Sequence, residues 1–201
     1  MSKIQICNRG LSTYLGASRI TSFTQDSPEA EQCDLHYPDV VQAIQERHWW
    51  DFNKARQTLA ELTNDRPTEW AYKYAKPATA IMIRWVNHPD VAIASILQNK
   101  SPDSDREMTS DAIYSNVQYA VCEFSVLVTD TTLFPQYVKD AISAELAASI
   151  AMPLTEDIKR ANNAMTVAQN RLDVAMALDE SNTPPIQGLV MPDWLTDRGI
   201  T

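Results

Sequence analysis

The sequence predicts a mainly α-helical fold: a helical bundle with a smaller β-rich insertion and an extended C-terminal tail. Apolar residues recur at steps of three and four in residues 1–50 and 131–180, which is the period of amphipathic helices. In residues 51–130, apolar and polar residues alternate as they do in strands. Prolines interrupt any period from 184 to 201. We therefore expect one domain over residues 1–183, followed by a tail over 184–201.

The first fifty residues predict two helices. In SKIQICNRGLSTYLGAS, apolar residues follow helical steps until Gly16, which is placed to end a helix. A second helix is expected to start after Asp26 or Ser27, with Pro28 in its first turn. Pro38 lies inside this second pattern and cannot donate a backbone hydrogen bond. The second helix should therefore kink near Tyr37 or divide into two pieces.

The middle of the chain predicts strands. The segments IMIRWV (81–86) and VQYAVCEFSVLV (117–128) alternate with a period of two. FNKARQTLAEL (52–62) fits both helical and strand spacing, and we favour a strand. The polar segment QNKSPDSDREMTSD (98–111) has no period, so we expect an exposed loop there.

Two long helices are expected in the last third. LFPQYVKDAISAELAASIAM has one apolar stripe, and Pro153 is placed to end it. Thr155 is placed to cap the next helix, with Glu156 and Asp157 in its first turn, where acids favour the helix dipole. This helix has a seam of larger residues and alanines, which is either the inward face of a bundle, as we favour, or a contact between subunits. The seam consists of Ile158, Ala161, Met165, Ala168, Leu172 and Ala175.

Composition excludes several classes of protein. The chain has 17 basic and 26 acidic residues, and its net charge of -9 argues against a sequence-independent grip on nucleic acid. No apolar stretch is long enough to cross a membrane, and MSKIQICNRG lacks the apolar core of a secretory signal, so the cytoplasm is the expected place of synthesis. Three distant cysteines, Cys7, Cys33 and Cys122, indicate reduced, buried thiols and no metal-ligand spacing.

Motifs for catalysis are missing from the sequence. It has four glycines, no glycine-rich phosphate loop, no nucleophile elbow and no zinc-binding helix. His36, His48 and His88 have no serine or cysteine in a recognisable arrangement nearby. We therefore expect no catalytic, cofactor-binding or metal-binding residue. The alternative is a soluble helical enzyme or accessory hydrolase that uses scattered acidic and histidine residues.

The tail combines apolar residues with prolines, which suits a segment that stays extended and docks on another protein. A strap across its own domain is the alternative. Its candidate contact residues are Ile186, Leu189, Val190, Trp194 and Leu195, with Trp194 as the anchor and Arg198 at the rim.

Five segments in order resemble one family. These are ICNRGLSTYLGASRITSF, DSPEAEQCDLHYPDVVQAIQERHWWDFNKARQTL, WAYKYAKP, VLVTDTTLFPQYVKDAISAELAASIAMPLTED and PDWL. Together they are similar to the head-to-tail adaptors of short-tailed phages, also called tail tubular protein A, over nearly the whole chain. No single segment is specific, but the ordered set is.

The resemblance implies a structural virion protein and no enzyme. Adaptors of this family form a twelve-membered ring beneath the portal protein, extend its DNA channel and offer a platform for the tail nozzle protein. Their C-terminal segment reaches along the portal. DNA would pass the acidic channel wall without specific binding.

Two adjacent tryptophans stand where the helical period gives way to the strand period. If the second helix ends near His48, then Trp49 and Trp50 point to different surfaces. We expect Trp49 to face the core and Trp50 to lie at an interface or subdomain boundary, although the reverse assignment and core positions for both also fit the pattern.

Overall fold

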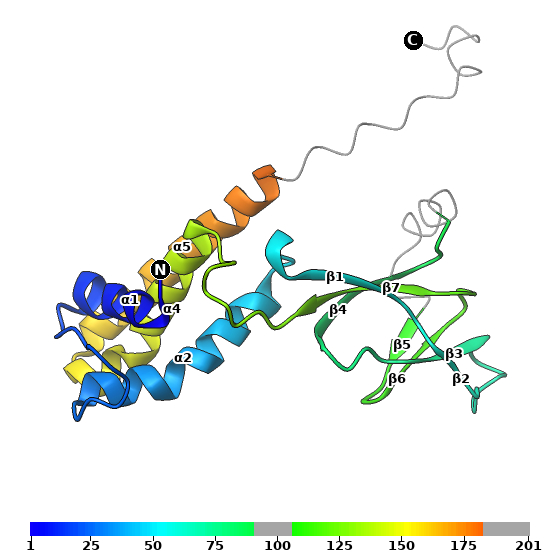
Figure 1. Ribbon diagram of the computed structural model, residues 1–201, viewed down its shortest axis with the longest axis horizontal. Helices are drawn as coiled ribbons and strands as arrows, with labels where there is room; N and C mark the ends of the chain where they lie inside the picture. Colours follow the sequence, from blue (N-terminus) through cyan, green and yellow to red (C-terminus); the bar gives the residue numbers. More distant parts are fainter. Residues whose placement is uncertain (91–105, 183–201) are drawn as a thin grey trace, which may run out of the picture.

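The computed structural model describes residues 1–90 and 106–182. Of these residues, 49% are helical and 19% lie in strands, which form two antiparallel sheets (Figure 1). The expected combination of helices with a smaller β-rich part is present, but the fold is mixed α/β and not clearly mainly α as expected. The sequence predicted three strands in the insertion, whereas the described residues contain seven, because several short strands have no clear period of their own.

The helical half is a bundle around one central helix. Helix α4 is buried on nearly all sides because α1, α2 and α5 pack against it. Gly10 allows the close approach of the first helical segment, since a Cβ at this position would lie 2.8 Å from the Ser143 carbonyl oxygen. The elements are α1 (Lys3–Arg9), the π-helical turn η1 (Gly10–Leu15), α2 (Pro28–Arg47), α4 (Gln136–Thr155) and α5 (Ile158–Asn182).

The predicted helix starts and stops are confirmed in the first fifty residues. Gly16 ends η1 in the left-handed conformation, with φ of 63°. The Ser27 side chain accepts a hydrogen bond from the Ala30 backbone N–H at the start of α2. Of the two outcomes expected at Pro38, a kink or a division, the division is wrong, because one helix runs through this residue. Pro38 lies on the exposed side of α2, where water can hydrate the carbonyl that loses its partner.

The boundary between α4 and α5 also differs from the expectation. Pro153 lies inside the last turn of α4, which continues to Thr155, so neither residue has its predicted role. Glu156 follows in the left-handed region, with φ of 49°. Asp157 caps α5 instead, because its Oδ1 accepts hydrogen bonds from the backbone N–H groups of Lys159 and Arg160.

The β-rich half consists of two sheets with their own core. The predicted strands near 54–58, 81–86 and 121–126 are confirmed as β1, β4 and β7, which form one sheet in the order β1-β7-β4. The second sheet has the order β2-β3-β6-β5. The bounds are β1 (Lys54–Thr58), β2 (Glu61–Leu62), β3 (Tyr72–Ala75), β4 (Ala80–Asn87), β5 (Arg106–Met108), β6 (Ala112–Ser115) and β7 (Val121–Val126).

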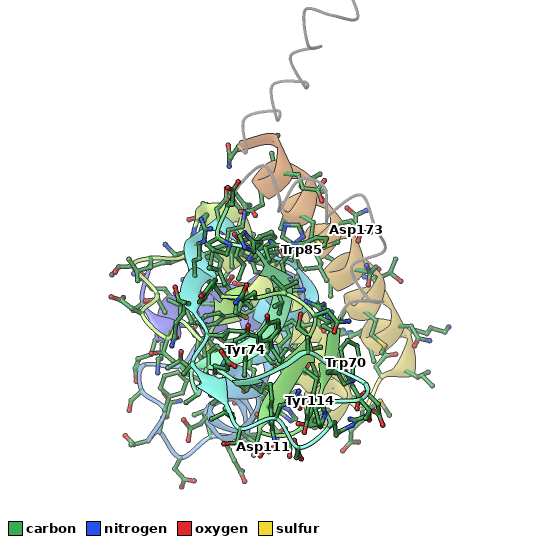
Figure 2. All side chains as sticks on the ribbon, turned by 90° about the vertical axis from the view of Figure 1, so that its right-hand side faces the viewer. Trp70, Tyr74, Trp85, Asp111, Tyr114 and Asp173 are labelled. Carbon is green, nitrogen blue, oxygen red and sulfur yellow. The ribbon has the colours of Figure 1, made fainter. Side chains whose placement is uncertain are left out.

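Strand β5 corrects the expected exposed loop over 98–111. Arg106–Met108 pairs with β6, and the residues from 98 to 105 lie outside the described part of the chain. The segment before β3 packs on β5 through Glu107, which accepts hydrogen bonds from Arg66 (2.7 Å) and from the Trp70 indole (3.3 Å). Trp70 and Tyr114, which lies beneath the Arg66 guanidinium, are visible on the near side of Figure 2.

Candidate interaction surfaces

The two halves of the molecule meet where α2 ends, and Arg84 of β4 closes this helix. Its Nη2 donates to the carbonyl oxygens of Glu46 (2.8 Å) and His48 (2.9 Å), and its Nε donates to Ser125 Oγ (3.2 Å). A cation at a helix C-terminus also interacts favourably with the helix dipole. One side chain of the first sheet therefore satisfies backbone groups that α2 would leave unpaired.

A second bridge joins α2 to the segment after β7. The Gln45 side chain is fully buried, and its amide forms a reciprocal pair with the backbone of Val128. Nε2 donates to the Val128 carbonyl and Oε1 accepts from the Val128 N–H, both at 2.9 Å. Since the Gln45 amide is buried and Val128 is half-buried, this pairing offsets the loss of water from the amide.

Asp179 connects the end of α5 to the same junction. The residue is only 2% exposed, and its Oδ1 accepts a hydrogen bond from the Tyr137 hydroxyl at 2.7 Å. Its Oδ2 accepts from the Asp51 backbone N–H at 3.2 Å and lies 3.3 Å from His48 Nε2. Burial and the hydrogen bond to Asp179 raise the pKa of Tyr137 to about 12. The last turn of α5 is thus held against α4 and the chain between α2 and β1.

The structure reverses the expected assignment of the two tryptophans. Trp50 is fully buried in the helical core, and its Nε1 donates to the Ile44 carbonyl at 2.8 Å. Trp49 is half-buried, with the Lys54 ammonium 4.7 Å from the centre of its ring. The chain becomes extended at His48, so adjacent side chains do diverge, but the direction in which it leaves α2 decides which of them faces inward.

Most of the predicted seam of α5 is confirmed, because four of its six residues, Ala161, Ala168, Leu172 and Ala175, are buried. Leu172 is buried at 4% exposure and packs in the helical core, whereas Ile158 and Met165 are 65% and 61% exposed. The inward stripe therefore keeps the predicted register, without Ile158 and Met165 and with Ala164 and Asp179 added. It consists of Ala161, Ala164, Ala168, Leu172, Ala175 and Asp179. A role for Ile158 and Met165 between subunits stays a prediction.

Sequence analysis missed the polar residues of the junction. Asp179 continues the i, i+3, i+4 series of buried positions through Leu172 and Ala175, but a carboxylate at such a position is ordinarily assumed to face solvent. Arg84 alternates with apolar neighbours along β4 and gave no sign that it would cap a helix. The predicted tail contacts, Ile186, Leu189, Val190, Trp194, Leu195 and Arg198, lie outside the described residues.

The junction also bears on the enzyme alternative. It places an imidazole next to a buried carboxylate, but the hydrogen bonds of Asp179 to Tyr137 and Asp51 give that carboxylate a structural role. In residues 1–90 and 106–182, no group of three or more His, Cys, Asp or Glu residues is arranged to hold a metal ion. Over the same residues, no helix combines the length and apolar character needed to span a membrane.

No protein-family model matches the sequence, and a search of curated proteins gave no match. The function is therefore inferred from the residues, their arrangement and the resemblance of the ordered motifs.

Proposed function

We propose that this protein is a head-to-tail adaptor of a short-tailed phage. In the virion it would form a ring of twelve copies beneath the portal protein, extend the DNA channel and present a platform for the tail nozzle protein. The ordered motifs support this proposal, as does the combination of a helical bundle with a smaller β-rich half (Figure 1). Such a protein functions by binding its neighbours in the virion and not by catalysis.

The observation on which the proposal depends most is the position of Asp179. This buried carboxylate fixes the last turn of α5, and the chain passes beyond Asn182 into the apolar, proline-containing segment a few residues later. A docking segment binds more tightly when it starts from a fixed point, because less freedom is lost on binding. The tail is therefore suited to reach a large, ordered partner such as the portal.

The charge of the chain agrees with a channel for DNA. Each subunit has a net charge of -9, so a ring of subunits would surround the passing duplex with negative charge. Because like charges repel, DNA would not adhere to the wall. This argument concerns the whole subunit and assigns no single residue to the channel.

Mixing the purified protein with the portal protein of the same phage tests the proposal. We expect a monomer or small oligomer alone and a ring on the portal, because a partner that binds only the assembled form stabilises it. Negative-stain imaging and size-exclusion chromatography measure both states, with the portal of an unrelated phage as the control. Failure to bind its own portal contradicts the function, and a stable twelve-membered ring without portal contradicts the order of assembly.

A further inference from the structure

Two of the three cysteines lie together in the helical core. All three are free thiols and are buried. Cys7 of α1 and Cys33 of α2 are both fully buried and belong to the same core cluster, whereas Cys122 lies in the separate core of the β-rich half. The Cys7 thiol donates a hydrogen bond to the Cys33 sulfur. Two neighbouring thiols can react with each other, which a single buried cysteine cannot do.

A second contact shows that the faces of α1 and α2 that carry these thiols meet. Lys3 lies one helical turn before Cys7, and Tyr37 lies one turn after Cys33. The Lys3 ammonium is 5.9 Å from the centre of the Tyr37 ring. The two helices are therefore antiparallel here, with Lys3 opposite Tyr37 and Cys7 opposite Cys33. Because the backbones are matched in this way, the two thiols stay opposite each other when either side chain changes its rotamer.

The two thiols differ in acidity. The hydrogen bond from Cys7 lowers the pKa of Cys33. The same hydrogen bond, together with burial, raises the pKa of Cys7. Cys33 therefore ionises first and is the thiol that attacks first. The Tyr37 hydroxyl is buried near Cys7 and has no hydrogen-bond partner within the described residues, so it is available to donate to a thiolate that forms later at Cys7.

We propose that Cys7 and Cys33 are a modification site, at which a small-molecule disulfide such as oxidised glutathione converts the two thiols into a disulfide between α1 and α2. The Cys33 thiolate attacks one sulfur of the reagent, so that a mixed disulfide forms and one glutathione leaves as its thiolate. The Cys7 thiolate then attacks Cys33 Sγ and releases the second glutathione. The protein loses two electrons and two protons, and the reagent takes them up to become two thiols.

The reaction requires α1 to move briefly away from α2, because both thiols are fully buried. A helix of seven residues can open locally while the rest of the bundle stays folded. Once formed, the disulfide restricts the unfolded chain and so stabilises the fold. The site does not depend on the proposed function, but it suits an adaptor, which would be assembled in the reducing cytoplasm and meet oxidising conditions after the virion leaves the cell.

Oxidation of the full chain provides the test. Native protein is incubated with oxidised glutathione, alkylated and digested, and mass spectrometry should find the Cys7 peptide linked to the Cys33 peptide, with Cys122 still alkylated. The melting temperature should rise by about 5–10 °C on oxidation, and dithiothreitol should reverse this rise. Cys122→Ala is the matched control, because it removes a buried thiol from the other core and should leave both the link and the rise unchanged.

Two further variants test the order of attack. Cys7→Ala should stop at the mixed disulfide, with glutathione bound to Cys33, whereas Cys33→Ala should bind much less glutathione. Circular dichroism checks that both variants fold, and the wild-type link is measured independently of them. The proposed site is overturned if native wild type forms no link between Cys7 and Cys33, or forms it only in urea. Glutathione on Cys7 of Cys33→Ala, at the level expected for Cys33, would overturn the assignment of Cys33 as the attacking thiol.

Discussion

At the scale of single residues, Trp50 contributes more to the junction than its neighbour. It is fully buried, donates a hydrogen bond to Ile44, and lies edge-on to the His48 ring with centroids 4.6 Å apart. Tyr137 and Phe52 lie further around it, with centroids 6.4 and 6.3 Å away. Trp49 has the Lys54 ammonium as its close charged neighbour. The two indoles should therefore differ in their effect on stability.

We predict that Trp50→Ala lowers the free energy of unfolding by about 3–5 kcal/mol, because it removes a large buried side chain and leaves a cavity. Trp49→Ala is the matched control, and its effect should be about 1 kcal/mol, since a half-buried indole loses less contact area. Urea unfolding followed by far-ultraviolet circular dichroism measures both values. Equal losses in the two variants would contradict the inward position of Trp50 alone.

At the scale of elements, α5 has one buried face and one exposed face, which can be tested separately. Leu172→Asp places an unpaired charge in the bundle and should cost several kcal/mol, so the variant should lose its cooperative melt. Met165→Asp, two turns earlier at 61% exposure, is the control and should melt as the wild type does. Differential scanning calorimetry measures the transition. If Leu172→Asp folds normally but fails to assemble, Leu172 lies between subunits and not in the core.

The sequence predicted the elements that have a strong period and missed those that depend on partners. The long helices and β4 can be predicted from the sequence, because their apolar spacing repeats over several turns or pleats. Strands such as β5 and β6, with three and four residues, form because each pairs with a neighbouring strand, which no local pattern encodes. Along α5 the register was predicted, but Ile158 and Met165 are exposed, whereas Ala164 and Asp179 are buried. Hydrophobicity alone does not decide which residues at the edge of a helix face are covered by neighbouring elements.

The tryptophan pair shows how far the sequence predicts the junction between the two halves of the molecule. The change of period at His48 predicted that the two indoles diverge, and the structure agrees. Which indole faces inward depends on where Arg84 and Gln45 hold the end of α2, and these contacts span 36 to 83 residues along the chain. Long-range hydrogen bonds of this kind leave no periodic signal.

At the scale of the whole molecule, the junction makes the two halves one mechanical unit. Arg84, Gln45 and Asp179 each join elements from different parts of the chain, and all three act within a few residues of His48. The proposed adaptor would hold a portal with one surface and a nozzle with another, and would therefore have to transmit load between them. Buried hydrogen bonds suit this role, because an unpaired buried polar group is costly and the geometry is therefore well defined.

The same organisation predicts that the tail is separable from the fold. Deleting residues 184–201 should leave helix content and melting temperature nearly unchanged, because α5 ends at Asn182 and Asp179 binds groups within the domain. Binding to portal should fall sharply. Trp194→Ala alone should weaken it by about 2 kcal/mol or more, as expected for a hot spot, whereas Arg198→Ala at the rim should have a smaller effect. Circular dichroism and titration calorimetry measure the two properties. If the truncated protein unfolds, or binds portal as the full chain does, the tail is an internal strap or has no part in docking.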